Sequence, residues 1–379
     1  MPWKEVTKMK LKREFIEFAK QDGVNFAELC KRYKISRTYG YELKNKYDQE
    51  GEEVFKERSK RPKVSPTKTC QKIEESILEV REAHLSWGGR KIYHYLKQEG
   101  QKEIPHPNTI TDILRRAGRL YEWKVGGMKK RCHRFEMERA NELWQMDFKG
   151  HFPLGDRECH PLTVLDDYSR YAIVLEACAN ERQEIVKEHL IKAFRRYGLP
   201  ERINVDNGSP WGSSQLIYAT QLQVWLMRLG IRLSHSRPFH PETNGKDERF
   251  HRTLKEEVLN LYTLMTLEES QEYFDRFRED YNTKRPHEAL HYEVPATRYQ
   301  MSPRPYPEKL LPINYPSGDK VYQVNKQSGC IVFRQKQIYV GYAFKGEPVS
   351  LRPTKIDGVF NIFYCQQKIK EIDFREAEK

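Results

Sequence analysis

Three acidic residues lie at positions where they could together hold divalent cations. Asp147 interrupts the apolar run LWQMDF, Asp206 follows the run RINV, and Glu248 lies in the basic stretch HPETNGKDERFHRTLK. Taken singly, each acid is more typical of a structural role, such as a turn at Asp206 or an i,i+4 ion pair between Glu248 and Arg252. Taken together, they offer the oxygen ligands that Mg²⁺ prefers, and two such ions can support in-line attack on a phosphodiester.

Alternating and helical apolar patterns predict the elements that would position these acids. In chain order we expect strands at ELWQMDFKG, CHPLTVLDDYS and RYAIVLEACA, a helix at QEIVKEHLIKAFRRYG, a strand at ERINVD, a helix at ATQLQVWLMRLG and a strand at IRLSHS. Three antiparallel strands followed by helix, strand and helix is the order of a ribonuclease-H-like α/β fold. Because the first and fourth strands are neighbours in that order, Asp147 and Asp206 are expected to lie close together.

A helix beginning just after Gly245 would separate the acids of its own segment. Helical spacing predicts a buried stripe of four apolar residues: Phe250, Leu254, Val258 and Leu261. On a helical wheel Asp247 lies about 60° from Phe250, near the stripe, whereas Glu248 lies about 160° away. We therefore expect Glu248 to point off the core.

Four motifs carry a resemblance to a known family: WQMDF, DNGSPWG, HPETNGKDERFHRTLKEE and YNTKRPHEAL. They resemble the integrase-core DDE transposases of bacterial insertion sequences, which are related to retroviral integrases, and most closely the group catalogued as insertion sequence four-eighty-one. The segments ISRTYGY and WGGRKIYHYL and the β-rich tail are also similar to that group, so the resemblance covers nearly the whole chain. It implies a catalytic, metal-binding triad of Asp147, Asp206 and Glu248, with two Mg²⁺ or Mn²⁺ ions.

The third acid of the triad has a competitor. In many relatives fewer residues separate the second and third acids of the triad, and that shorter spacing would select Glu242. In this chain 41 residues lie between Asp206 and Glu248. We choose Glu248 because its G-x-x-E-R-F context and the helical wheel agree, and because extra loop residues between 209 and 222 can absorb the difference. The resemblance further implies that Lys255, seven residues after Glu248, contacts transposon-end DNA.

Other titratable residues are less convincing candidates. Asp166 and Asp167 lie at a turn between strands beside Arg170, where capping or an ion pair is the favoured role. Three histidines could in principle act as a base, but metal activation removes the need for one: His235, His240 and His251.

Charge and composition indicate a partner and a compartment. The net charge of the 379 residues is +13, and residues 1–140 carry 33 basic against 21 acidic side chains. Such a cationic region suits nucleic acid. No apolar stretch is long enough for a membrane span or a signal peptide, so we expect a bacterial, cytoplasmic, nucleoid-associated protein without a membrane partner. The seven cysteines include no C-x-x-C pair, so we expect neither a disulfide scaffold nor zinc.

The predicted fold class is multidomain. An all-α region of two tandem helix-turn-helix units, a ribonuclease-H-like α/β catalytic core and a small C-terminal antiparallel β-barrel follow one another, with Ser36 as a helix N-cap in the first unit. The expected boundaries are 1–56 and 70–120 for the helix-turn-helix units, 57–69 and 121–139 for basic linkers, 140–300 for the core, 301–319 for a Pro-rich linker and 320–379 for the barrel.

Basic and aromatic side chains in these parts are expected to contact DNA. The candidates are Arg37, Tyr39, Lys44, Lys46, Arg61, Lys63, Arg115, Arg116, Lys130, Arg131, Lys246, Arg252 and Lys255. The connector 57–69 is expected to lie along DNA and to become ordered on binding.

The resulting functional hypothesis is a DNA transposase that binds terminal inverted repeats and catalyses metal-dependent cleavage and strand transfer. Its partners would be transposon-end DNA and target DNA, and both ends must be held at once by a homodimer or larger assembly. One alternative is a catalytically inactive, sequence-specific DNA-binding regulator on the same scaffold. Another is a nuclease that cuts RNA–DNA hybrids, against which the large basic N-terminal region argues.

Overall fold

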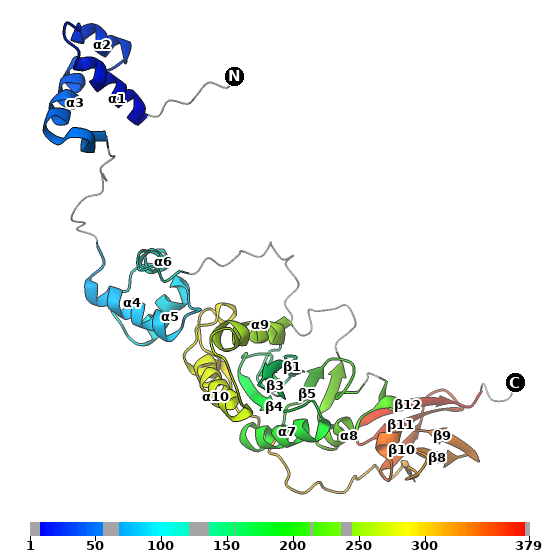
Figure 1. Cartoon of the computed structure of the whole chain (residues 1–379). Helices are drawn as coiled ribbons and strands as arrows, with labels where there is room; N and C mark the ends of the chain where they lie inside the picture. The colour runs from blue at the N-terminus through cyan, green and yellow to red at the C-terminus, as the bar shows by residue number, and fades with distance from the viewer. Residues whose placement is uncertain are drawn as a thin grey trace. The chain divides into compact units, whose positions relative to one another are not determined.

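A computed structural model describes residues 8–55, 68–120, 136–155, 157–212, 215–235 and 245–375. The chain forms two compact units, Met1–Lys68 and Thr69–Lys379 (Figure 1). Among the residues so described, no helix is both long and apolar enough to cross a membrane.

The first unit is a three-helix domain. Phe15, Leu29 and Leu43, one from each helix, are buried together in its core. The Ser36 hydroxyl accepts a hydrogen bond from the Tyr39 backbone N–H at 3.1 Å, which confirms the predicted N-cap of the third helix. The helices are α1 (Lys8–Ala19), α2 (Phe26–Arg32) and α3 (Arg37–Glu50).

A second group of three helices opens the larger unit. Trp87, Ile77 and Ile110 are fully buried in its own small core. Arg81 is also buried, and its guanidinium donates to the Trp87 carbonyl at 2.8 Å, so the charge stabilises the loop before the middle helix. The helices are α4 (Gln71–Ala83), α5 (Gly89–Gln98) and α6 (Pro107–Arg116).

This second helical group contacts the α/β core through the Glu257 side chain. The Glu257 carboxylate accepts a hydrogen bond from Ser86 at 2.6 Å and one from Arg285 at 3.0 Å, and it lies 3.9 Å from the Lys91 ammonium. Burial alone would raise the pKa of Glu257, but Arg285 and Lys91 hold it below its ordinary value. One half-buried carboxylate therefore joins α5 and its preceding loop to the core.

Replacing Glu257 with Gln is expected to loosen this contact by roughly 3 kcal/mol, because the substitution leaves the buried Arg285 guanidinium without its anion. Hydrogen exchange at the α5 backbone amides should become faster. Glu288→Gln is the matched control, since its ion pair with Arg90 is exposed and should contribute less than about 1 kcal/mol. Equal exchange rates in the two variants would contradict the prediction.

The core is built on a six-stranded sheet in the order β2-β3-β1-β5-β6, with β4 paired to β3. Strand β1 runs antiparallel to β3 and parallel to β5, as the predicted fold requires. Of the strands in this sheet, the short strand β2 was not predicted from the sequence. The strands are β1 (Trp144–Phe148), β2 (Phe152–Leu154), β3 (Arg157–Asp166), β4 (Ala172–Cys178), β5 (Arg202–Val205) and β6 (Arg232–His235).

Helices cover both faces of this sheet (Figure 1). One apolar cluster joins the sheet to α7 (Gln183–Tyr197) and α8 (Gln221–Arg228). A second cluster joins its other side to α9 (Gly245–Leu254) and α10 (Leu267–Thr283). The fold is thus the expected α/β core, and it positions α9 against β1 and β3.

The helix that carries Glu248 ends differently from the prediction. After α9 the chain continues as one π-helical turn, Lys255–Leu259. Phe250, Leu254 and Val258 are buried as expected, but Leu261 is 41% exposed. The stripe was extrapolated at a constant helical period, and the π turn with the helix end that follows it changes that period.

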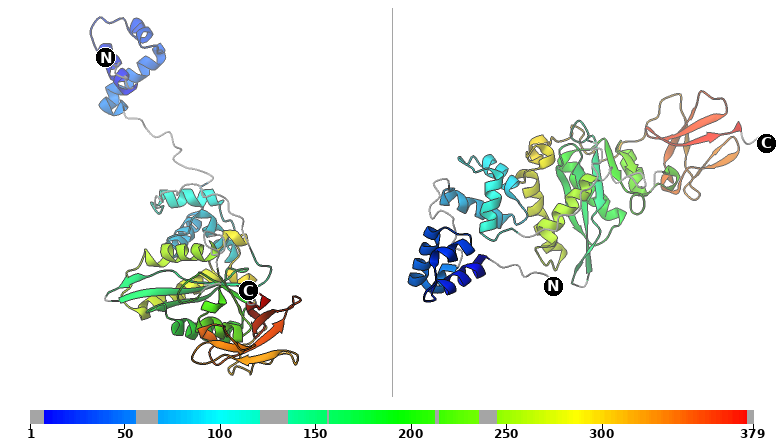
Figure 2. Two further views of the ribbon diagram at one scale, coloured as in Figure 1. Left: turned by 90° about the vertical axis from the view of Figure 1, so that its right-hand side faces the viewer. Right: turned by 90° about the horizontal axis from the view of Figure 1, so that it is seen from above.

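The C-terminal region forms two separate sheets instead of the predicted barrel (Figure 2). Among the described residues, the outer strands of the four-stranded sheet are unpaired on one side, so no closed barrel forms. Val224 and Met227 of α8 are buried within this region's core, which supplies apolar cover that a barrel would otherwise provide internally. The sheets comprise β7 (Lys320–Gln323), β10 (Pro348–Pro353), β11 (Val359–Tyr364) and β12 (Gln367–Asp373), and separately β8 (Cys330–Phe333) and β9 (Lys336–Tyr339).

Candidate active site

Asp147 is the fourth residue of the five-residue strand β1 and is half-buried between the buried residues Met146 and Phe148. Its Oδ1 accepts a hydrogen bond from the Phe148 backbone N–H at 2.8 Å. Partial burial, followed by the charges of Asp206, Glu181 and Glu248, raises the pKa of Asp147 to about 7. A carboxyl held by its neighbours in this way binds either a proton or a cation at neutral pH.

Parallel pairing brings Asp206 beside Asp147. The register pairs Trp144 with Ile203 and Gln145 with Asn204, and two residues further along each strand lie the two aspartates. Asp206 follows the last residue of β5 and is exposed. The prediction that the first and fourth predicted strands are neighbours is therefore confirmed.

Glu248 lies in the first turn of α9 and is exposed, while Asp247 beside it is only 1% exposed. This difference agrees with the helical wheel. The charge of Glu248 is among the causes of the raised pKa of Asp147, so the two carboxylates interact. Glu242, the competing acid, lies outside the described residues.

Asp247 is the residue whose place sequence reasoning did not anticipate. Its carboxyl oxygens lie 3.1 and 3.2 Å from the Thr163 hydroxyl of β3, and Oδ2 lies 3.5 Å from His251 Nε2. Burial, and then the charge of Asp147, raises the pKa of Asp247 well above its ordinary value. Only the wheel position of Asp247 near the apolar stripe signalled that it would be buried.

The histidines differ in their surroundings. His251 is largely but not fully buried, and its burial lowers its pKa to about 3, so its imidazole is neutral. His235 interacts through Nδ1 with the Asp206 backbone carbonyl at 3.1 Å. His240 lies outside the described residues.

Asp166 and Asp167 are buried and structural. Asp166 accepts hydrogen bonds from the Ser169 hydroxyl at 2.6 Å and from the Asn141 backbone N–H at 2.7 Å. Asp167 accepts one from the Gln145 side chain at 2.7 Å and pairs with Lys246. The favoured structural role fits these contacts, although the cation that pairs with Asp167 is Lys246 of α9.

Several predicted DNA contacts face local partners. Lys246 is held by Asp167, so its ammonium anchors the first turn of α9. Arg115 pairs with Asp112, and Arg116 with Glu74 at 3.0 Å, within their own helical group.

Other predicted contacts are open to solvent or lie outside the description. The exposed ones are Arg37, Tyr39 and Lys46 of the first unit and Arg252 and Lys255 after Glu248, while Lys44 is half-buried. Those outside the described residues are Arg61, Lys63, Lys130 and Arg131.

The acidic edge fits a hard divalent cation. Four carboxyl groups, those of Asp147, Asp206, Asp247 and Glu248, influence one another's charge, and carboxylate oxygens are ligands for Mg²⁺ and Mn²⁺. The raised pKa of Asp147 shows that its charge is poorly compensated by the protein alone. A bound cation would supply that compensation.

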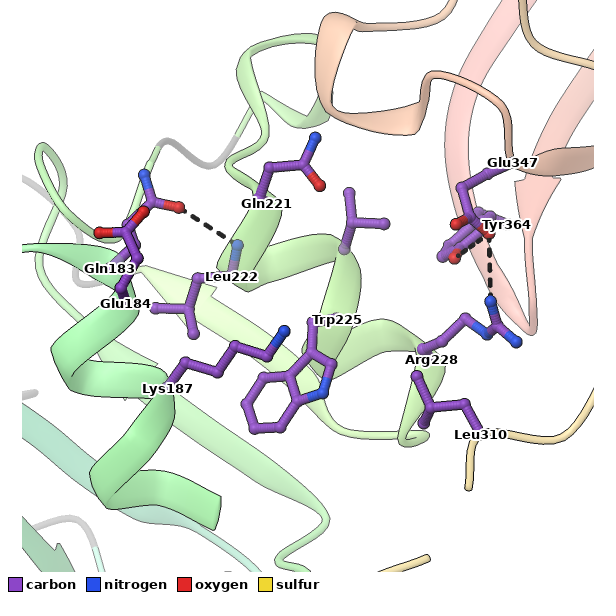
Figure 3. Close-up of a pocket in the computed structure, with 11 residues that line it drawn as sticks. Gln183, Glu184, Lys187, Gln221, Leu222, Trp225, Arg228, Leu310, Glu347 and Tyr364 are labelled. Carbon is purple, nitrogen blue, oxygen red and sulfur yellow. Dashed lines mark hydrogen bonds and ion pairs between the residues drawn. The ribbon is translucent and has the colours of Figure 1, made fainter. Parts of the chain in front are cut away.

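A separate hollow with a volume of about 240 Å³ lies where α7 and α8 meet the C-terminal sheet (Figure 3). Both basic side chains that line it have partners: Arg228 lies 3.4 Å from Glu347, and Lys187 lies over the Trp225 ring at 5.2 Å. Tyr364 donates to Glu347 at 2.9 Å. None of the four acids lines this hollow, which belongs to a domain junction.

Family models match four parts of the chain. Two models described as integrase core domain match residues 137–241 and 229–295. The model described as IS481 family transposase, C-terminal domain, matches residues 319–379, and a helix-turn-helix domain matches residues 11–63.

Three of the curated proteins that the chain resembles come from bacterial insertion elements. The chain is 27% identical to the "uncharacterized 31.7 kDa protein" of insertion element IS407 from Burkholderia multivorans, over 62% of this chain and 82% of that protein. It is 25% identical to the 39.2 kDa protein of IS476 from Xanthomonas euvesicatoria, over 61% and 65%. It is 28% identical to the transposase for IS904 from Lactococcus lactis, over 55% and 72%.

Solved structures show weaker likeness. A chain of the simian T-cell lymphotropic virus intasome in complex with PP2A regulatory subunit B56 gamma is 16% identical, with a TM-score of 0.40, over 79% of this chain and 96% of that one. The HTLV-2 integrase catalytic core domain in complex with magnesium is 15% identical, with a TM-score of 0.34, over 43% and 99%. The likeness therefore rests on the family matches to the core and the tail. In its core the chain is similar to integrase core domains, and in its tail it is similar to the C-terminal domain of IS481 family transposases.

Proposed function

We propose that this protein is a DNA transposase that binds the terminal inverted repeats of its element and catalyses metal-dependent DNA cleavage and strand transfer. The observation that supports this most is the acidic edge, where Asp206 and Glu248 contribute to raising the pKa of Asp147 to about 7. These three acids come from β1, from the residue after β5 and from α9, which are distant in the sequence.

In this proposal Asp147, Asp206 and Glu248 hold two Mg²⁺ or Mn²⁺ ions. When bound there, such ions would supply activation of a water or a 3′-hydroxyl and stabilisation of the leaving oxygen of a phosphodiester. Arg252 and Lys255 are exposed and follow Glu248 on the same stretch of chain, so their positive charges can hold the phosphates that flank the reacting one. His251 is neutral and mostly buried, and it supports α9 through its contacts with Asp247 and Thr163.

DNA recognition in this proposal belongs chiefly to α3. Its N-terminal residue Arg37 and the exposed side chains of Tyr39 and Lys46 are available to DNA. Because two element ends and a target must be held together, we propose a homodimer or larger assembly that acts at the bacterial nucleoid.

The proposal is tested by incubating the purified full chain with labelled element ends, a supercoiled plasmid and Mg²⁺ or Mn²⁺. Joined products that require the metal are expected. If the protein binds the ends but yields no joined product with either metal, the regulator alternative replaces the transposase. Cleavage of an RNA–DNA duplex without joining would favour the nuclease.

A further inference from the structure

Asp247 is a buried carboxyl that the proposed triad does not use. It lies on the sheet-facing side of α9, one residue before Glu248, and is 1% exposed. Ligand atoms of Asp147, Asp247 and His251 all lie within 4.8 Å of one another. A carboxylate oxygen of Asp247 is therefore within reach of a cation bound to Asp147.

The hydrogen bonds available to Asp247 are too few to compensate a buried negative charge. The Thr163 hydroxyl lies within hydrogen-bond distance of both Asp247 oxygens, of the Asp147 backbone carbonyl at 2.9 Å and of His251 Nε2 at 2.8 Å. A hydroxyl has one proton, so it can donate to only one of these acceptors. An ionised Asp247 can thus receive at most one hydrogen bond from Thr163.

The charges around Asp247 do not replace the missing donors. The neighbouring charges are themselves negative: Asp147 and Asp206 on the strand and loop beneath it, and Glu248 on its own helix. Within the part of the chain that the structure describes, no Lys or Arg lies within ion-pair distance of the Asp247 carboxyl. An unpaired buried charge of this kind is costly unless a cation binds to it.

We propose that Asp247 is a fourth carboxylate of the metal centre, which adds an oxygen ligand beside that of Asp147 when divalent cations bind, with Thr163 and His251 fixing its orientation. This inference rests on the proposed metal-dependent function. Four carboxylates would carry four negative charges, which two divalent cations neutralise. Mn²⁺ is the suitable probe because carboxylate oxygens are ligands that suit it.

The test compares Mn²⁺ binding to the full chain and to Asp247→Asn by isothermal titration calorimetry and by the electron paramagnetic resonance signal of free Mn²⁺. Asparagine keeps the shape and the contact with Thr163 but removes the charge. We expect the variant to bind one ion fewer, or to bind one ion at least tenfold more weakly. Asp275→Asn is the control, since it makes the same charge change on an aspartate of α10 that is 52% exposed.

Wild-type stoichiometry and affinity in Asp247→Asn would overturn the inference, as would the absence of Mn²⁺ binding to the wild type. If the asparagine variant fails to fold by circular dichroism, Asp247→Ala is measured in the same way. Failure of the proposed function looks different. If the Asp247→Asn variant binds Mn²⁺ more weakly than the wild type, but the wild type joins no DNA, the fourth ligand is supported and the transposase function is rejected.

Discussion

Replacing Asp147, Asp206 or Glu248 with alanine is expected to reduce metal-dependent strand transfer at least about a thousandfold. Each substitution removes a ligand of the proposed cations, and metal stabilisation of the reacting phosphate contributes several kcal/mol, of which about 4 kcal/mol corresponds to that factor. The acids lie in the larger unit and the α3 surface in the other, so binding to inverted-repeat DNA should change less than about threefold. Quantifying joined product and the bound fraction on the same DNA measures both effects.

Two control variants make this prediction specific. Glu181→Gln removes another acid that raises the pKa of Asp147, but one outside the triad, and should leave most of the activity intact. Glu242→Ala tests the competing assignment of the third acid. If Glu242→Ala were inactive and Glu248→Ala active, the triad would have to be reassigned to Glu242.

Metal-free protein is expected to become less stable as the pH rises from about 4 to about 8. Folding raises the pKa of Asp147 from 3.8 to about 7, so between these values the folded state binds more protons than the unfolded state. The free energy of unfolding therefore falls through this range and levels off above it. Asp147→Asn removes this titration and should be more stable than the wild type at pH 8 by on the order of 2 kcal/mol.

Urea unfolding followed by tryptophan fluorescence, in the presence of a chelator, measures the difference at pH 5 and pH 8. Adding Mn²⁺ at pH 8 should reverse the order, because only the wild type retains the Asp147 carboxylate. Asp275→Asn should follow the wild type under all conditions. A wild type that is equally stable at both pH values without metal, or a variant that gains as much from Mn²⁺, would contradict the prediction.

The arrangement of the core could be predicted because its signals are local. Apolar alternation identifies β1 and β5 even though Asp147 interrupts the first, and the order of elements then makes the two strands neighbours. Glu248 was separated from Asp247 by helical geometry alone, and exposure in the structure follows that division. These inferences need no knowledge of distant contacts.

The rest depends on contacts between segments far apart in the sequence. Lys246 was predicted to contact DNA because it lies in a stretch rich in basic residues. In the structure its ammonium forms an ion pair with Asp167, which lies 79 residues earlier in the chain. The barrel was inferred from period-two alternation in the tail, which cannot reveal that Val224 and Met227 would cover the apolar side. Likewise, nothing in the pattern around Asp247 indicates that Thr163 is its partner.

The sharing of Val224 and Met227 with the C-terminal sheets has a practical consequence for dissecting this protein. A shortened chain that stops before residue 319 would expose both apolar side chains to water. An exposed apolar surface of that kind promotes aggregation. Recombinant work on the catalytic portion should therefore retain the tail, or replace these two residues with polar ones when it is removed.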